Sequence, residues 1–240
     1  MKKVIKILLA ILILLIIFAG VLTFTHQKTQ QNNVFLDDNA TVIGSNSNGT
    51  VYKMEYGNNS STDTAIIILG VHSLESGIHN ATYEVIKNLT ASNSLNRKYI
   101  VYFIKLNFED SGMNTSDYDT NRHMGELLAN RYILPDIENY DPYVIVDVHE
   151  MEVYYDLQRY VGVIENKTST TLDYANSIGN YVGYPVYKVN SGTSPKWVTI
   201  PLHEKGYNVI LFETAQADTQ NNKTLTAIDL VRSIDSLPIY

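Results

Sequence analysis

Three short stretches of the sequence carry side chains suited to holding a metal ion. In TAIIILGVHSLESG, an apolar run is followed by His72 and Glu75, three positions apart. His149 follows the apolar run YVIVDV, and Glu213 closes the run NVILFE. Two histidines and one carboxylate form a three-ligand catalytic zinc site that leaves a fourth position open for water. We therefore predict that His72, Glu75 and His149 bind one Zn²⁺ per chain, with Glu213 as the general base for that water.

Most of these residues also have an ordinary structural explanation. His72 and Glu75 could stand at the start of a helix, where the helix dipole stabilises a carboxylate. His149 could be a buried histidine that hydrogen-bonds at a strand end. Glu213 is harder to explain in this way, because a carboxylate at the end of an apolar strand is costly to bury without a partner.

Neighbouring polar residues give weaker predictions. Asp147 and Glu150 flank His149, and either carboxylate could orient a ligating imidazole. Ser194 precedes a proline and is predicted to be the N-cap of a helix. His79 is predicted to be an exposed residue near a helix start, so no function is assigned to it.

The elements that position these residues follow from the hydrophobic pattern. Short apolar runs rich in β-branched residues predict strands buried on both faces, and segments with helical spacing separate them. This alternation predicts an α/β fold, a single domain with a mixed, largely parallel sheet covered by helices on both faces. In such sheets ligands bind at the carboxyl ends of strands. The predicted strands are 51–56, 64–70, 99–106, 143–148, 160–164, 186–189 and 208–213, and the predicted helices include 78–89, 121–133, 172–181 and 225–234.

The order of these residues resembles the zinc carboxypeptidase superfamily, which includes aspartoacylase and succinylglutamate desuccinylase. The resemblance rests on GVHSLE, DTNRHMGE, VDVHE and LFETA, which occur in this order within residues 64–216. It implies that the zinc ligands are His72, Glu75 and His149, that Asn121 and Arg122 grip a substrate carboxylate, and that Glu213 is catalytic. Without the resemblance, an i,i+4 ion pair with Glu126 is the simpler explanation of Arg122.

The sequence departs from this family at two points. The family usually has an additional Arg that helps to hold the oxyanion, yet no basic residue lies between Leu106 and Asn121, and Lys105 is the nearest substitute. The substrate-facing tyrosine of the family could correspond to Tyr184, Tyr187 or Tyr207. The sequence therefore leaves open which residue holds the oxyanion and which tyrosine faces the substrate.

The N-terminal residues predict a membrane anchor. Lys2, Lys3 and Lys6 precede an uncharged apolar run of 18 residues, 7–24, which is near the lower limit for a helix that crosses ~30 Å of hydrocarbon. The basic flank places this end in the cytoplasm and the remaining chain outside. A cleaved signal peptide is the alternative. We predict a retained transmembrane helix at 1–25, in a single-pass protein of the cell membrane.

The chain beyond the anchor divides into a stalk and one domain. Residues 26–50 are mostly polar and are predicted to be a stalk or linker, and 51–240 the zinc carboxypeptidase-like hydrolase domain. The chain beyond residue 25 has 25 acidic and 15 basic side chains, a formal net charge of −10. This acidity argues against a nucleic-acid partner. The absence of cysteine excludes disulfides and every cysteine-based site.

Together, these features predict a membrane-anchored, zinc-dependent hydrolase that acts outside the cytoplasm. Its substrate would be a peptide or an N-acyl amino acid with a free carboxylate, cleaved at a peptide or amide bond next to that carboxylate. Two alternatives stay open. One is a deacylase of the aspartoacylase and succinylglutamate desuccinylase type, and the other is a catalytically weak surface binding protein that retains zinc.

Overall fold

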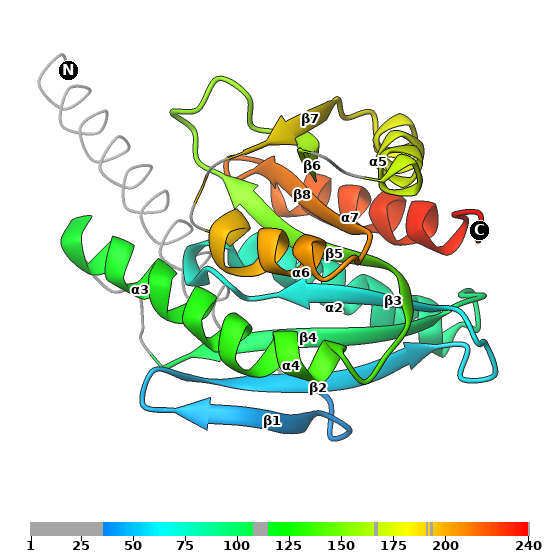
Figure 1. Ribbon diagram of the computed structural model, residues 1–240, viewed down its shortest axis with the longest axis horizontal. Helices are drawn as coiled ribbons and strands as arrows, with labels where there is room; N and C mark the ends of the chain where they lie inside the picture. Colours follow the sequence, from blue (N-terminus) through cyan, green and yellow to red (C-terminus); the bar gives the residue numbers. More distant parts are fainter. Residues whose placement is uncertain (1–35, 108–114, 166–167, 191, 193, 240) are drawn as a thin grey trace, which may run out of the picture. The chain divides into compact units, whose positions relative to one another are not determined.

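A mixed β-sheet forms the centre of the domain, and its strands lie in the order β1-β2-β4-β3-β5-β8-β6-β7 (Figure 1). The computed structural model describes residues 36–107, 115–165, 168–190, 192 and 194–239, without the side chains of 115–121, and all eight strands lie in these ranges. The strands are β1 (Thr41–Asn46), β2 (Gly49–Gly57), β3 (Thr64–Leu69), β4 (Lys98–Leu106), β5 (Pro142–Met151), β6 (Tyr160–Ile164), β7 (Val186–Val189) and β8 (Val209–Ala215).

Four parallel strands form the middle of this sheet. Strands β4, β3, β5 and β8 run in the same direction, and β2 and β6 flank them in antiparallel orientation. Every residue of β3 after the first is buried, because a strand that is covered on both faces needs apolar side chains at every position. The carboxyl ends of the four strands meet at one edge of the sheet, which we call the carboxyl edge; the opposite edge is the amino edge.

Helices cover both faces of the sheet. Figure 1 shows α3, α4 and α6 in front of the sheet, and α2 and α7 behind it. On the front face, Ile66 of β3 packs in one buried cluster with Leu128 and Leu202, and behind the sheet α2 buries Ile78 and Ile86. The helical segments are η1 (Ser73–Glu75), α2 (Ser76–Ala91), α3 (Thr115–Leu128), η2 (Ala129–Ile133), α4 (Leu134–Ile137), α5 (Ser169–Val182), η3 (Pro195–Thr199), α6 (Ile200–Glu204) and α7 (Gln220–Asp235). The predicted α/β domain with a mixed sheet is confirmed.

The predicted boundary between stalk and domain at residue 50 is wrong for 37–50. The compact unit begins at Asp37, and β1 pairs with β2 inside the stretch that was predicted to be a linker. Strand β1 is an edge strand with exposed residues at both ends, so backbone pairing rather than burial holds it. A strand of this kind lacks the apolar alternation by which the others were identified. The backbone N–H of Asp37 also donates to the Tyr83 hydroxyl at 2.9 Å.

The predicted membrane anchor lies outside the described residues. Across the described ranges, no helix is both long enough and apolar enough to cross a membrane.

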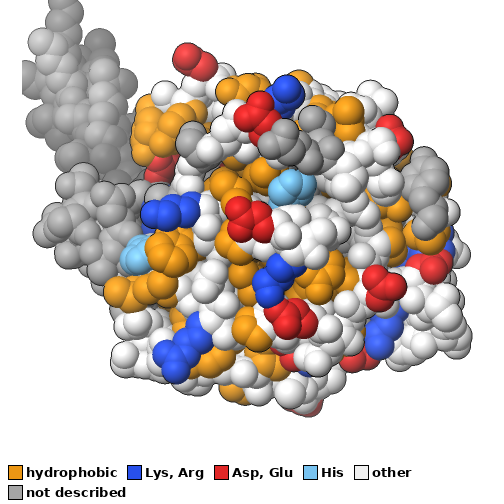
Figure 2. Space-filling view, viewed as in Figure 1, with side chains coloured by type: hydrophobic (Ala, Val, Ile, Leu, Met, Phe, Trp, Pro, Cys, Tyr) orange, Lys and Arg blue, Asp and Glu red, His pale blue; other side chains and the backbone are white. Residues whose placement is uncertain are grey.

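On the face drawn in Figure 2, Lys and Arg side chains lie scattered among Asp and Glu side chains.

Candidate metal centre

The carboxyl edge brings together the three predicted metal ligands. One ligand atom each of His72, Glu75 and His149 can be chosen so that all three atoms lie within 4.8 Å of one another. All three side chains are buried, with 1% of each residue exposed. Among the described residues this is the only group of three such side chains close enough to share an ion. The three residues predicted as metal ligands therefore lie together in the folded chain.

Local backbone geometry explains how this group forms. After β3, Gly70 has a φ of 80° and turns the chain; a Cβ at this position would lie 2.2 Å from the carbonyl oxygen of Ile104. His72 then directly precedes the single turn η1, and Glu75 is the last residue of that turn. His149 lies within β5 rather than after it, because β5 continues to Met151.

The Glu75 carboxylate lies between the two imidazoles. Its Oε1 is 2.7 Å from Nδ1 of His72, and its Oε2 is 2.8 Å from Nδ1 of His149. Arg122 donates from Nη1 to Oε1 at 3.0 Å. Burial pushes the pKa of Glu75 upward, but the charges of His72 and His149 outweigh it and hold that pKa well below its usual range.

Two further carboxylates hold the outer nitrogens of the imidazoles. Nε2 of His149 lies 2.9 Å from Oδ1 of Asp147, and Nε2 of His72 lies 3.1 Å from Oε1 of Glu126. Burial alone would lower the pKa of His149, but Asp147 and Glu75 raise it well above the usual value. A metal that binds Nδ1 must displace the proton on that nitrogen, whereas the proton on Nε2 stays against the outer carboxylate.

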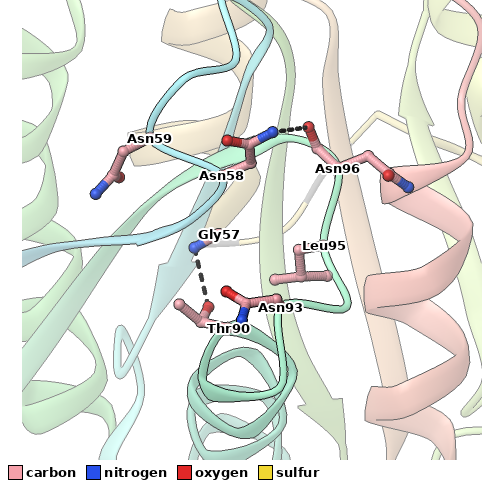
Figure 3. A pocket seen from close by; sticks show the side chains of 7 residues that line it. All are labelled: Gly57, Asn58, Asn59, Thr90, Asn93, Leu95 and Asn96. Atoms are coloured by element: carbon pink, nitrogen blue, oxygen red, sulfur yellow. Dashed lines mark hydrogen bonds between the residues drawn. The ribbon is translucent and has the colours of Figure 1, made fainter.

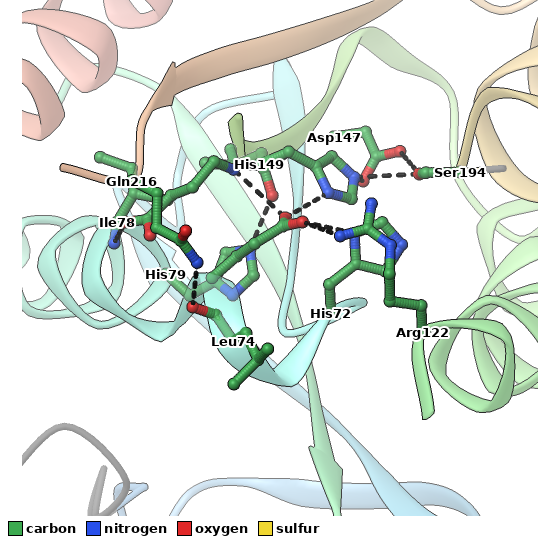
Figure 4. Close-up of polar contacts among 12 residues, drawn as sticks. His72, Leu74, Ile78, His79, Arg122, Asp147, His149, Ser194 and Gln216 are labelled. Atoms are coloured by element: carbon green, nitrogen blue, oxygen red, sulfur yellow. Dashed lines mark hydrogen bonds and ion pairs between the residues drawn. The ribbon is translucent and has the colours of Figure 1, made fainter. Parts of the chain in front are cut away.

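This arrangement fits zinc. Two Nδ1 atoms and a carboxylate face one another, which matches the His₂Glu set of catalytic zinc sites. Carboxylates on the outer nitrogens are the usual partners of metal-ligating histidines, because they fix ring orientation and tautomer. Figure 4 shows His72 and His149 facing the same point, with Asp147 and Ser194 beside His149.

Glu213 lies beside the ligands on the neighbouring strand. Its Cα pairs in register with that of His149 across β5 and β8. The residue is 7% exposed, and its Oε2 is buried without a hydrogen-bond partner. Burial, followed by the nearby charge of Glu75, raises the pKa of Glu213 to about 8, although His149 opposes the shift. A bound cation would lower this pKa again, because positive charge favours the carboxylate.

The two residues predicted to bind substrate differ in what the structure describes. Arg122 belongs to α3 and reaches Glu75 of the ligand group, so it lies at the metal centre. Asn121 precedes it in α3, and its side chain lies outside the described part of the chain. Lys105, the nearest substitute for the missing Arg, is exposed on β4, where it pairs with Thr50 of β2.

Several neighbours of the site lie elsewhere than the sequence predicts. Ser194 makes no side-chain cap contact; its hydroxyl instead donates to Oδ2 of Asp147 and lies 3.0 Å from Nε2 of His149. His79 is buried rather than exposed, and its Nε2 lies 2.8 Å from the carbonyl oxygen of Val148. The sequence predicts Glu126 as an ion-pair partner of Arg122, and in the structure its carboxylate contacts His72. No local signal in the sequence would have identified these contacts.

Of the three candidate tyrosines, Tyr187 is linked to Glu213 through Tyr160. Its exposed ring lies 5.4 Å from the ring of Tyr160, and the Cα of Tyr160 pairs with that of Glu213. Tyr184 stacks instead on Phe212 at 5.6 Å.

A second feature lies at the amino edge. A pocket of about 410 Å³ is lined mainly by polar side chains that include Asn58, Asn59, Asn93 and Asn96 (Figure 3). These residues precede β3 and β4 or follow α2. The pocket therefore contains none of the three predicted metal ligands.

Comparison with known proteins shows likeness in structure only. No family model and no curated protein matches the sequence. A metallo-carboxypeptidase from Burkholderia cenocepacia superposes with a TM-score of 0.53 at 11% sequence identity, covering 82% of this chain and 64% of that chain. The present chain thus corresponds to less than two thirds of that protein.

Two other solved structures match less closely. They are the cell shape determinant protein Csd4 from Helicobacter pylori, with a TM-score of 0.48 at 12% identity over 77% of this chain and 54% of that chain, and the ectoine utilization protein EutE from Ruegeria pomeroyi, with a TM-score of 0.48 at 12% identity over 78% and 59%. At such identities a likeness concerns the fold. The chain shares its fold with the Burkholderia metallo-carboxypeptidase, in agreement with the fold that the resemblance in the sequence implies.

Proposed function

We propose that the protein is a zinc-dependent hydrolase of a peptide or amide bond next to a substrate carboxylate. One observation carries this proposal. His72, Glu75 and His149 converge within 4.8 Å, and Glu213, whose Oε2 has no hydrogen-bond partner, lies on the adjacent strand. A structural role leaves this buried, unsatisfied carboxylate unexplained, since each such group costs free energy in the folded state.

The roles of the residues follow from their chemistry. Zinc held by His72, Glu75 and His149 would polarise the scissile carbonyl and lower the pKa of its bound water to ~7. Glu213 would accept the proton of the attacking water and then donate it to the leaving amine. Asp147 and Glu126 would hold the imidazoles in the orientation that points Nδ1 inward.

Arg122 would recognise the substrate carboxylate. Its guanidinium is planar and matches a carboxylate with two parallel hydrogen bonds. In the structure it pairs with Glu75 at 3.0 Å, so a substrate carboxylate would bind directly beside the metal ligands. Asn121 is proposed as the second group at this subsite.

We also propose that the domain is anchored in the cell membrane and lies outside the cytoplasm. The support is the sequence of the first 25 residues, with an uncharged apolar run behind Lys2, Lys3 and Lys6. The positive flank favours a cytoplasmic N-terminus.

The decisive experiment combines metal analysis with activity. The full-length chain should contain about one zinc, and His149→Ala should lose it, because two remaining ligands bind weakly. Release of free amino acids should then be measured from dipeptides and from N-acyl amino acids. Hydrolysis of dipeptides identifies a peptidase, whereas hydrolysis of acylated amino acids alone identifies a deacylase. Hydrolysis that survives the removal of zinc contradicts the proposal.

A further inference from the structure

A helix outside the ligand-bearing segments contacts the metal group from the front face. Glu126 of α3 is fully buried, and its Oε1 lies 3.1 Å from Nε2 of His72. Its Oε2 lies 3.2 Å from Nδ1 of His123, whose ring lies 5.1 Å from that of Trp197. Both oxygens of Glu126 are therefore engaged, which restricts how the carboxylate can turn.

The contact is possible only because α3 approaches the end of β3 very closely. A Cβ at Gly125 would lie 1.8 Å from the carbonyl oxygen of Val71. Real Cβ atoms do not approach a backbone oxygen so closely, so any larger residue would move α3 away. Gly125 immediately precedes Glu126, and Val71 immediately precedes His72. Displacement at Gly125 would therefore act directly on the pair Glu126–His72.

The direction of this hydrogen bond determines which nitrogen of His72 faces the metal. A carboxylate accepts only, so the proton of the pair must lie on Nε2. Nδ1 of His72 faces the Glu75 carboxylate at 2.7 Å, and a metal that bound Nδ1 would leave the proton of the ring on Nε2, against Glu126. His149 shows the same pattern, with its Nε2 against Asp147. The two ligating rings thus each have their own buried carboxylate.

We propose that Glu126 is a positioning residue for the metal ligand His72. We propose also that Gly125 is required, because only a residue without a side chain lets α3 approach Val71 closely enough for Glu126 to reach His72. This inference rests on the zinc site of the proposed function. Glu126 touches no substrate atom in this scheme. It acts through His72, by fixing the tautomer and the orientation of the ring. The negative charge of Glu126 also raises the basicity of Nδ1 as a metal ligand.

The test measures zinc affinity of the full-length chain by competition with a chromophoric chelator. Glu126→Gln keeps the size of the side chain, but its amide can donate as well as accept, so both tautomers of His72 become accessible. We expect about 10–100-fold weaker zinc binding, the usual effect of losing such a partner. Gly125→Ala changes no polar group and should weaken binding in the same direction.

Gly179→Ala is the matched control. Gly179 lies in α5, where a Cβ would meet the carbonyl oxygen of Tyr184 at 2.7 Å, so this substitution also crowds a helix but far along the chain from the ligands. It should lower the melting temperature and leave zinc affinity unchanged. Equal losses of affinity in Gly179→Ala and Gly125→Ala would show general destabilisation and overturn the proposal.

A second measurement does not depend on whether the variants of Gly125 and Glu126 fold. Long-range ¹H–¹⁵N spectra of the zinc-loaded chain should show His72 with Nδ1 bound to metal and Nε2 protonated, its signals being identified by their loss in His72→Gln. Metal on Nε2 would overturn the positioning role, and so would unchanged affinity in Glu126→Gln. A wild-type chain that binds no zinc would instead refute the proposed function itself, and this inference with it.

Discussion

Two buried carboxylates lie at opposite edges of the sheet. One has hydrogen-bond partners, whereas the other has an oxygen without a partner. At the amino edge, Asp235 accepts hydrogen bonds from the backbone N–H groups of Asn96, at 2.9 Å, and Arg97, at 3.0 Å. At the carboxyl edge, Glu213 has an oxygen that is buried without a partner. Since an unpartnered buried carboxylate is costly, Asp235 stabilises the fold, whereas Glu213 retains an acceptor for a ligand or a proton.

Glu150 shows that position at the carboxyl edge does not by itself make a carboxylate functional. It directly follows His149 in β5, yet its Oε1 lies 2.7 Å from Nζ of the buried Lys223 and accepts from the backbone N–H of Ile78 at 2.6 Å. Burial, only partly offset by Lys223, raises its pKa to about 7. Its partners come from α7 and α2, so Glu150 joins elements, whereas Glu213 does not.

The largest expected effect is a loss of hydrolytic activity on substitution at the carboxyl edge. Glu213→Gln should reduce turnover by about 10²–10⁴-fold, the usual contribution of a general base, while zinc content stays the same. Steady-state hydrolysis and metal analysis of the same sample measure both quantities. Glu138→Gln, an exposed carboxylate paired with Lys205, is the control and should keep full activity. Full activity in Glu213→Gln would remove the contrast between the edges.

The corresponding change at the amino edge should affect stability alone. Asp235→Ala leaves the backbone N–H groups of Asn96 and Arg97 without their acceptor, and we expect the free energy of unfolding to fall by about 2–4 kcal/mol. Urea denaturation measures this loss, and zinc affinity should be unchanged. Asp156→Ala, at an exposed loop position, should cost almost nothing. A loss of zinc affinity in Asp235→Ala would show that the edges are coupled.

The pH dependence of stability sharpens the comparison for the metal-free protein. The pKa of Glu213 is raised to about 8, so the folded state holds a proton that the unfolded chain releases near its ordinary value. This contribution to stability is complete below pH ~4.5 and is lost as the pH rises through about 8.

Comparison with Glu213→Gln isolates this contribution from those of other groups. Between pH 5 and 9, the free energy of unfolding of the wild type should fall relative to that of the variant, by an amount on the order of a few kcal/mol. Thermal or urea unfolding of both proteins in the presence of a chelator checks this. Parallel pH profiles would mean that Glu213 titrates normally and is not held neutral by burial.

The smallest expected effect concerns the support of His149. Ser194→Ala removes a hydroxyl that donates to Asp147 at 3.0 Å, a contact worth about 0.5–1.5 kcal/mol. Zinc affinity should fall by roughly 2–10-fold, as measured by chelator competition. Ser177→Ala, which removes a hydroxyl from the exposed side of α5, should leave the affinity unchanged. Equal effects of the two substitutions would exclude a specific role of Ser194.

Much of the fold could be predicted because the central strands are buried on both faces. Strand β3 has an unbroken apolar run, and such runs are distinctive in sequence. Strand β1 was missed because an edge strand depends on backbone pairing, which leaves no apolar pattern. The domain therefore begins at Asp37, earlier than its hydrophobic pattern indicates.

The contacts around the ligands could not be predicted for a different reason. The sequence Arg122 to Glu126 has the spacing of a helical ion pair, and only the docking of α3 against Val71 directs Glu126 to His72. Likewise, Ser194 before a proline is typical of an N-cap, and only the packing of η3 against β5 brings its hydroxyl to Asp147.

The sequence by itself indicated that His72, Glu75, His149 and Glu213 lie together, because each stands within or shortly after an apolar run and parallel strands bring such positions to one edge. The tertiary structure alone decided how each of them is held. Hydrogen-bond partners, ring orientation and pKa depend on side chains that arrive from distant helices at distances of about 3 Å. The local pattern of the chain does not encode those distances.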